Sequence, residues 1–494
     1  MRIYIAILGI LCLLFSCKNE EKSGAKTPSK EIWQEEALAF LSNEEHLLSF
    51  GVLEMDQLLT KSIYNSQLSE SVLIPLDMIE DYSKLIYTKL PIYFAIRSNV
   101  EGDLTSPEAL VICKIKSKSL AIETIKKDFP IGEIIEENGV KFLFTNDFKI
   151  GFTDNEMIFF ISKNIDNKQA RIAIQKTING LKSKKTNTEI AQTIAAKDDI
   201  TFAINIEEIH KSLRKVMNAE DSETTKLVQG TIAMHLSFEK GKIVLTNKNY
   251  LSKQGKGLNI FAKNSKAMLN KLGAGSPIAA MTLALDMQGL EKLQKQYLPK
   301  SISNTIQDSE IDASMKNLVP RELSVIEALI QKDGIQNYID GNFAFGQYSV
   351  DEKHMEYSAY FGIGPGLEEI LKNEFNPIKG FFHSLEIDDT RMELYTSEVN
   401  GPQNNVNKLQ LKPQFEALGA KPISAFWDIE QNSYKELFKN DIITERILEL
   451  LKHMTLNGDL TGGELMITMK DEQENSMTQI ANLIPSLVLE SIFQ

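Results

Sequence analysis

The sequence has little cysteine, little tryptophan and no excess of positive charge, and each shortage excludes a class of protein. Its 494 residues contain only three cysteines and two tryptophans, and 54 Lys+Arg stand against 67 Asp+Glu. Three cysteines cannot form the dense disulfide framework that holds small secreted domains together. A formal net charge of −13 argues against nucleic acid as a partner, because phosphate binding needs clustered Lys and Arg.

Long apolar runs are also missing, with one exception near the N-terminus. Ile3–Phe15 is an uninterrupted apolar run that follows Arg2. It is shorter than the roughly 20 residues that a transmembrane helix needs. A short apolar run behind a positive residue is typical of a secretory signal peptide, which is removed from the mature protein. No later segment approaches a spanning length, so we expect no membrane-spanning helix elsewhere.

The end of this run, Leu14-Phe15-Ser16-Cys17, resembles the lipobox of bacterial lipoproteins. The resemblance implies that residues 1–16 are cleaved off and that Cys17 is the site of lipid (palmitate) attachment. An ordinary cysteine beside an uncleaved anchor is the alternative. Residues 17–30 then form a polar tether. Its acidic pair resembles the export tag of Bacteroidota surface lipoproteins, although any solvated tether would look similar. The resemblance thus implies outer-membrane attachment through lipid, on the periplasmic or the surface-exposed face.

An apolar, strand-like run that leads directly into an amphipathic helix recurs four times along the chain. Each run ends at a polar residue placed to cap the following helix, namely Glu54, Asn205, Asp286 or Asp428. Asn205, Asp286 and Asp428 are the expected structural helix caps, because Asn and Asp side chains accept from the free N–H groups of a first helical turn. These residues therefore need no catalytic explanation.

The spacing of the four units predicts two tandem halves. The first and third are 232 residues apart (286 − 54), and the second and fourth 223 (428 − 205). We therefore predict an α+β protein of two related halves, residues 31–272 and 273–494, each with a mainly antiparallel sheet and repeated strand-to-helix units. Chance recurrence of a common strand–helix pattern is the alternative. With the lipobox and the length, this pattern resembles an uncharacterised Bacteroidota lipoprotein family, a domain of unknown function.

Sequence motifs for catalysis or metal binding are missing. None of the six histidines forms an HExxH motif or a close pair with zinc-ligand spacing, and no GxSxG occurs. His383, Glu386 and Asp388 form the most metal-like group. They alternate with apolar residues, however, which favours a strand with one solvent-exposed face. We expect no catalytic residue, no metal and no cofactor. Cys113, inside an apolar run, is expected to be an inert core thiol.

These observations favour a lipid-anchored cell-envelope protein with a non-enzymatic binding or scaffold role, whose partner besides the membrane is not specified by any motif. Two alternatives stay open. One is a hydrolase of unrecognised type with an acidic site between the halves, since paired carboxylates can be far apart in sequence. The other is a carrier of a hydrophobic ligand, which a large apolar cavity would favour.

Overall fold

The computed structural model describes residues 28–62, 85–98, 107–145, 148–162, 166–195, 198–216, 230–251, 260–297, 338–349, 355–364, 367–368, 384–387, 391–395, 409–430 and 442–483. Cys17, residues 1–16 and most of residues 17–30 lie outside these ranges. The described part combines α-helices with extensive antiparallel β-sheet, as the predicted α+β class requires. None of the helices in these ranges has both the length and the apolar character to cross a membrane.

By internal packing the chain divides into two units that interleave along the sequence. The first unit comprises residues 1–216, 231–243 and 472–494, and the second comprises residues 217–230 and 244–471. Each unit is described by itself below.

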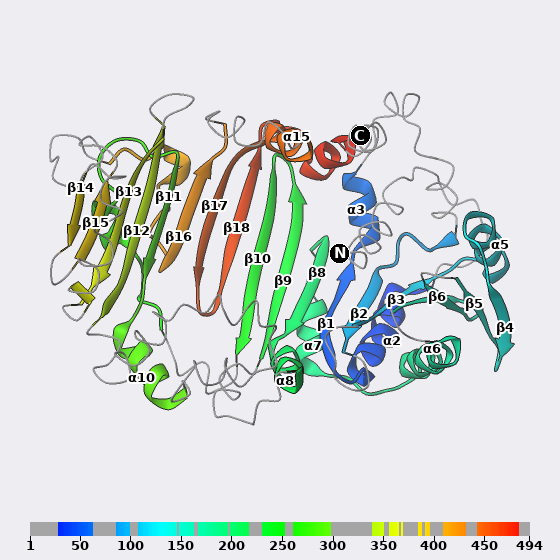
Figure 1. Cartoon of the computed structure of the whole chain (residues 1–494). Helices are drawn as coiled ribbons and strands as arrows, with labels where there is room; N and C mark the ends of the chain where they lie inside the picture. Colours follow the sequence, from blue (N-terminus) through cyan, green and yellow to red (C-terminus); the bar gives the residue numbers. More distant parts are fainter. Residues whose placement is uncertain are drawn as a thin grey trace. The chain divides into compact units, whose positions relative to one another are not determined.

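The first unit is built on an antiparallel sheet with the strand order β4–β5–β6–β7–β3–β2–β1–β8–β9 (Figure 1). Its strands are β1 (Leu47–Leu53), β2 (Ile92–Arg97), β3 (Glu108–Lys114), β4 (Glu133–Glu137), β5 (Val140–Phe144), β6 (Lys149–Phe152), β7 (Glu156–Ile161), β8 (Ile200–Asn205) and β9 (Gly230–Glu239). Strand β3 is buried along its whole length, which requires cover on both faces of the sheet.

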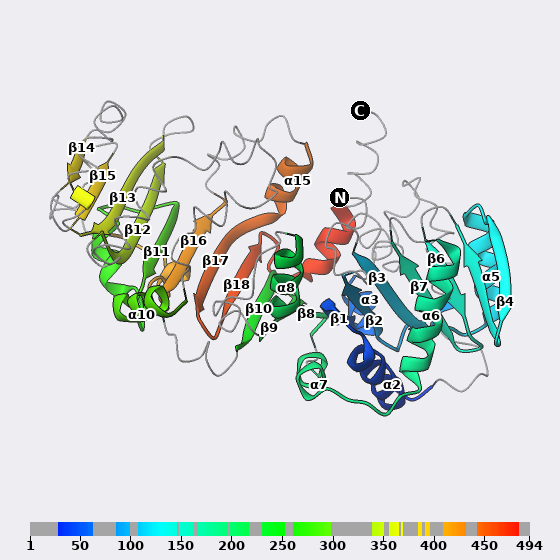
Figure 2. The same cartoon turned by 60° about the horizontal axis from the view of Figure 1, so that its bottom comes forward.

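Helices supply that cover. Residues of α2 (Lys30–Asn43), α6 (Asn167–Leu181) and α7 (Thr188–Ile194) form one core cluster with the sheet, which includes the fully buried Trp33. Residues of α3 (Met55–Lys61) and α5 (Lys118–Asp128) form a second cluster with other strand residues. Figure 2 shows α6 lying along the sheet, where it contacts β6 and β7. The helix α8 (Ile206–Val216) continues directly from β8.

Residues 472–483 return to the first unit and complete it. The Gly241 N–H donates to the Glu474 carbonyl at 2.9 Å, and the Thr478 hydroxyl donates to the Lys61 carbonyl at 2.5 Å across 417 positions of sequence. Met477 is 3 % exposed and belongs to the core cluster that contains α3 and α5. The first unit therefore needs residues from both ends of the described chain.

The second unit is built on an antiparallel sheet with the strand order β14–β15–β13–β12–β11–β16–β17–β18, and β10 pairs with β18. Its strands are β10 (Lys242–Leu251), β11 (Ala279–Ala284), β12 (Ile339–Ser349), β13 (Met355–Ile363), β14 (Ser384–Ile387), β15 (Arg391–Tyr395), β16 (Ile423–Asp428), β17 (Leu451–Asp459) and β18 (Gly462–Met469). The other elements are α10 (Met287–Tyr297), α15 (Ile442–Leu450) and the 3-10 helices η2 (Lys266–Lys271) and η6 (Pro413–Phe415).

The two sheets have the same neighbour order over six strands. The series β7–β3–β2–β1–β8–β9 in the first unit corresponds to β15–β13–β12–β11–β16–β17 in the second. In both series the strand in the middle, β1 or β11, leads into a helix, α3 or α10. The correspondence extends to sequence order, because each central strand comes first in its series.

Candidate functional site

The residues predicted to cap helices lie at the ends of separate strands and do not converge on one site. Asn205 Oδ1 accepts a hydrogen bond from the Glu208 N–H at 3.2 Å, and Asp286 Oδ1 accepts one from the Gln288 N–H at 3.1 Å. Asp428 ends β16, and residues 431–441, where its helix was predicted, lie outside the described ranges.

The Asp428 carboxylate is instead engaged in an ion pair. It is 2 % exposed, and Lys412 Nζ donates to its Oδ2 at 2.5 Å. His453 lies directly opposite Asp428 on β17, and its ring meets the Phe415 ring edge-on at a centroid distance of 5.4 Å. The charge of this buried carboxylate is therefore balanced by a lysine inside the fold.

The arrangement closest to a catalytic one is Asp198, His235 and Thr201 in the first unit. His235 Nδ1 lies 3.1 Å from Asp198 Oδ2 and 3.3 Å from Thr201 Oγ1. In a nucleophile–histidine–acid triad the acid accepts from one ring nitrogen and orients the ring, while the other nitrogen takes the proton of the nucleophile. Here both partners contact the same nitrogen, and Thr201 is fully buried on β8. The contacts therefore join β8, β9 and Asp198, which lies two residues before β8.

Buried carboxylates of the first unit are also held by cations. Lys61 Nζ lies 2.7 Å from both oxygens of the fully buried Asp199, which also accepts from the Phe238 N–H at 2.6 Å. Arg97 bridges Glu44 at 2.5 Å and Glu108 at 2.6 Å.

Burial raises the pKa of the Glu44 carboxyl, and the charge of Arg97 opposes that shift. Burial alone would lower the pKa of Arg97, but Glu44 and Glu108 together raise it. The bridge therefore holds a cation between two acids inside the fold.

Cys113 is a core thiol, as predicted. It is 4 % exposed on β3, and burial raises the pKa of its thiol to about 12, so the nucleophilic thiolate does not form near neutral pH. No group of three His, Cys, Asp or Glu side chains in the described ranges could hold a metal ion. His383 and Asp388, from the most metal-like group in the sequence, lie outside those ranges.

The feature that stands out is one face of the second sheet. Along β11 and β16 every second residue is buried, and the residues between them are partly exposed. Register places the partly exposed residues of neighbouring strands directly opposite one another, so they share one face. We call this surface the apolar face; its members are Met281, Leu283, Phe343, Phe345, Tyr357, Ile423, Ala425, Trp427, Met454, Leu456, Leu465 and Ile467.

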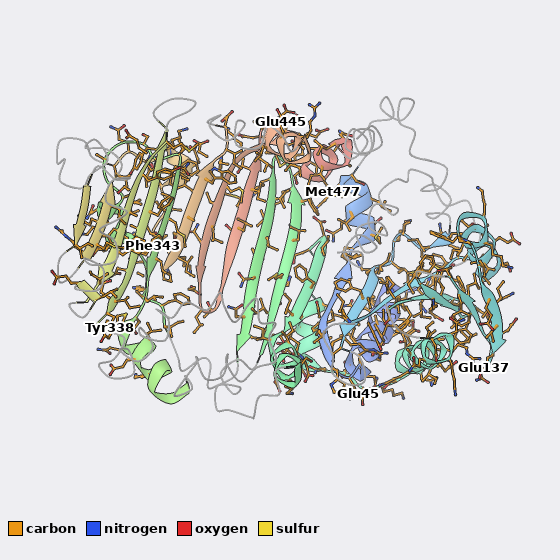
Figure 3. The ribbon with its side chains drawn as sticks, in the orientation of Figure 1. Glu45, Glu137, Tyr338, Phe343, Glu445 and Met477 are labelled. Atoms are coloured by element: carbon orange, nitrogen blue, oxygen red, sulfur yellow. The ribbon has the colours of Figure 1, made fainter. Side chains whose placement is uncertain are left out.

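The apolar face is continuous across the strands. One row runs from Phe345 through Met281, Ala425 and Leu456 to Leu465, each residue directly opposite the next on β12, β11, β16, β17 and β18. A parallel row joins three strands through Trp427, Met454 and Ile467. None of the members is charged. Figure 3 labels Phe343, which lies on β12 within this sheet.

Aromatic side chains on this face pack against each other and remain partly open to solvent. Phe343 meets Phe361 of β13 edge-on at 4.9 Å, and Phe345 stacks on Tyr357 at 6.0 Å. Tyr357 is 36 % exposed and Leu456 is 37 % exposed. Phe361 also packs against a small buried cluster with Met392, so this side of the face is closed.

The opposite face of the second sheet is covered, and its side chains range from alanine to phenylalanine and tyrosine. Its core cluster contains Ala280, Ala344 and Phe426 from the strands, with Phe415 and Leu418 packed over them. The Phe415 and Phe426 rings stack at 3.9 Å.

Two hydroxyl contacts tie the covered face together. Ser265 Oγ and Thr282 Oγ1 lie 2.8 Å apart, and Ser424 Oγ donates to Asn457 Oδ1 at 2.8 Å. In this sheet large apolar residues therefore lie on both faces, with Phe426 and Tyr360 on the covered face and the members of the apolar face on the other. A sheet face that serves only to meet water is expected to carry polar residues instead.

Comparisons with known proteins give a partial match. The model of a domain of unknown function (DUF4836) matches residues 86–324. No curated protein matches the sequence. Among solved structures, crystal form I of TP0453 is 7 % identical and crystal form III is 6 % identical.

These matches cover 44 % and 47 % of this chain and 79 % and 82 % of the matched chains, with TM-scores of 0.26 and 0.27. Such scores are too low to establish a common fold. The biochemical role must therefore be inferred from the sequence and structure of this chain.

Proposed function

We propose that this protein is a lipid-anchored, non-enzymatic binding protein of the bacterial cell envelope, and that the apolar face is the surface on which it binds an apolar partner. The observation that carries the binding role is the continuous row of apolar side chains, four large ones and Ala425, across β12, β11, β16, β17 and β18. Contiguous exposed apolar surface is uncommon on soluble proteins and marks sites of interaction.

The energetics support this assignment. Apolar surface in contact with water costs about 25 cal/mol per Å² relative to burial. The apolar face carries Met281, Phe345 and Leu456, where the solvated face of an antiparallel sheet would carry polar residues. These apolar side chains are explained if a partner covers them.

The anchoring part of the proposal rests on sequence. A positive residue, a short apolar run and Leu14-Phe15-Ser16-Cys17 are the features that direct lipidation of a cysteine, and the resemblance to a Bacteroidota lipoprotein family points to the outer membrane. Metabolic labelling with an alkynyl palmitate should mark the wild-type protein in membranes. Cys17→Ser should lose the label and accumulate with its signal peptide uncleaved. A labelled Cys17→Ser protein would refute the anchor.

A binding role is favoured over the hydrolase alternative by the state of the buried acids. Asp199, Glu108 and Asp428 are each held by a lysine or arginine at 2.7 Å or less. In known acid–base pairs of carboxylates the surroundings drive the pKa values of two neighbouring acids apart, whereas each of these three acids is paired with a cation instead.

We also infer that the two units derive from one duplicated ancestor. The shared order over six strands supports this, as does the register. Thr201 opposite His235 in the first unit corresponds to Ser424 opposite Asn457 in the second, and in both pairs the hydroxyl contacts its cross-strand neighbour, at 3.3 Å and 2.8 Å. On this view one copy acquired helices over both faces, and the other kept one face for binding.

The binding role can be tested with the fluorescent apolar probe bis-ANS. The mature chain, residues 17–494 with Cys17→Ser, should bind the probe, and Met281→Lys should reduce the fluorescence increase several-fold, because it places a charge in the middle of the row. Ile172→Lys is the matched control, since Ile172 is 62 % exposed on α6 of the first unit. Leu456→Lys gives a second test at a more exposed position. Equal probe binding by all four proteins would overturn the role.

A further inference from the structure

We propose that the occupant of the apolar face is the hydrocarbon chain of a single lipid molecule, lying across the strands. This inference rests on the binding role proposed above and specifies the chemistry of the partner.

The dimensions of the central row fit such a chain. Five neighbouring strands contribute Phe345, Met281, Ala425, Leu456 and Leu465 to the row, and strands are spaced about 4.8 Å apart, so the row is about 19 Å long. A lipid chain occupies about half of a hydrocarbon core of roughly 30 Å, or about 15 Å. One chain can therefore contact every strand of the row.

The same dimensions disfavour a second copy of the protein as the occupant. Three residues of one strand in alternation span about 14 Å, which gives the row and its neighbours an area of about 300 Å². A stable protein–protein interface buries about 800 Å² on each partner. The apolar face alone supplies less than half of that area.

The chemistry of the row favours hydrocarbon over a polypeptide. No member carries a charge, and none offers a backbone edge, because each strand of the row is paired on both sides. A peptide on this surface would leave its own N–H and C=O groups without partners. A hydrocarbon chain has no such groups.

The row and the parallel row beside it also have side chains that accommodate a flexible chain. Met281 and Met454 have unbranched, polarisable side chains that adapt to irregular apolar ligands. Between Met281 and Leu456 lies Ala425, whose side chain ends at Cβ, so that a chain crossing the row can approach the sheet most closely there.

Tryptophan placement allows a direct test. Trp33 is fully buried in the first unit. Trp427 lies on the apolar face, two residues after Ala425 on β16. Contact with a bromine atom quenches tryptophan emission, so a stearic acid brominated at mid-chain reports binding next to Trp427. The mature chain with Cys17→Ser is used, so that its own lipid cannot compete.

We expect saturable quenching at about one fatty acid per protein, competition by unbrominated stearic acid, and no quenching in Trp427→Phe. Met281→Lys should weaken the apparent affinity at least tenfold, whereas Ile172→Lys should not change it. Circular dichroism melting curves check that each variant is folded, and Leu456→Lys replaces Met281→Lys if that variant is not.

Three results would overturn the inference. Absence of quenching, with bis-ANS binding still sensitive to Met281→Lys, would reject the lipid chain and leave the binding role standing. Dimerisation in light scattering that Met281→Lys abolishes would assign the face to a second copy. Binding to phosphatidylcholine vesicles without binding of monomeric fatty acid would assign it to a bilayer surface. Insensitivity of bis-ANS to Met281→Lys would reject the binding role as well.

Discussion

Strand β3 of the first unit is buried along its whole length, whereas its counterpart by neighbour order, β13 of the second unit, alternates between buried and partly exposed residues. Both strands lie two places from the middle strand of their series. The difference comes from the segments around them, since α2, α6 and α7 pack on one face of the first sheet and α3 and α5 on the other. A shared strand order therefore does not determine how far the described segments cover a sheet, and the sheet that these segments cover less is where we place the binding surface.

The largest expected effect contrasts the same substitution in the two sheets. Phe160→Ala removes a side chain that is 1 % exposed in the first core and should lower the free energy of unfolding by about 3–5 kcal/mol. Phe345→Ala removes a partly exposed ring from the apolar face and should cost about 1 kcal/mol or less. Chemical denaturation measures both.

Each unit has its own tryptophan, which separates the two transitions. Trp33 emission in a Trp427→Phe background follows the first unit, and Trp427 emission in a Trp33→Phe background follows the second. Equal losses for the two alanine variants would mean that the apolar face is packed as tightly as a core.

Next in size is the loss of a buried charge partner in the first unit. Lys61→Met leaves the carboxylate of Asp199 buried without its cation, which should cost about 3 kcal/mol. Lys61→Arg keeps the charge and should retain most of the stability. A Lys61→Met protein as stable as wild type would show that the Phe238 N–H alone satisfies Asp199.

A smaller effect is expected from the covered face of the second sheet. Thr282→Val removes the hydroxyl that lies 2.8 Å from Ser265 Oγ and should cost about 1 kcal/mol, because Ser265 keeps its hydrogen bond to the Lys421 carbonyl. Met281→Leu, on the adjacent residue but the opposite face, is the control and should be nearly neutral. Unfolding curves followed by Trp427 emission measure the loss of stability in both variants. Equal costs would mean that the two faces are equally packed.

The smallest effect is a dependence on pH in the turn between β17 and β18. Burial alone would raise the pKa of Asp459, but hydrogen bonds from Lys421 and Thr461 lower it to about 2. A carboxyl whose pKa is lower in the folded state than in the unfolded state stabilises the fold above the unfolded value, near 3.8, and loses that contribution as the pH falls towards 2.

Asp459→Asn should therefore reduce the fall in melting temperature of the second unit between pH 4 and pH 2, with at most about 1 kcal/mol at stake. Asp154→Asn is the control, because its carboxylate is 90 % exposed and lies 3.6 Å from Lys118 in the first unit. An unchanged acid profile in Asp459→Asn would contradict the assignment of the low pKa to that carboxyl.

Local structure could be predicted from the sequence. Asn205 and Asp286 accept hydrogen bonds at the starts of α8 and α10, where the pattern of strand, polar residue and helix placed caps. The antiparallel sheets and the buried Cys113 thiol were likewise predicted. These features depend on neighbours in sequence or on alternation along one strand, which is why a single sequence can reveal them.

The apolar face could not be predicted from the sequence, because distant segments determine which side of a strand is covered. β11 alternates small and large apolar residues, and nothing within it indicates that the small ones are buried by Phe415 and Leu418 from more than a hundred residues away. The sequence also does not reveal the register, that is, which residues of two paired strands lie opposite each other. His235 and His453 fall near similar hairpins, but His235 lies opposite Thr201, whereas His453 lies opposite Asp428.

The hydrogen bond between Thr478 and Lys61 bears on when the protein can fold. The first unit begins the described chain, yet it lacks Met477 in its core and the Glu474 partner of Gly241 until residues 472–483 have been made. Domains commonly fold in order of synthesis. Here the core of the first unit is complete only once residues 472–483 have been made, after the whole of the second unit.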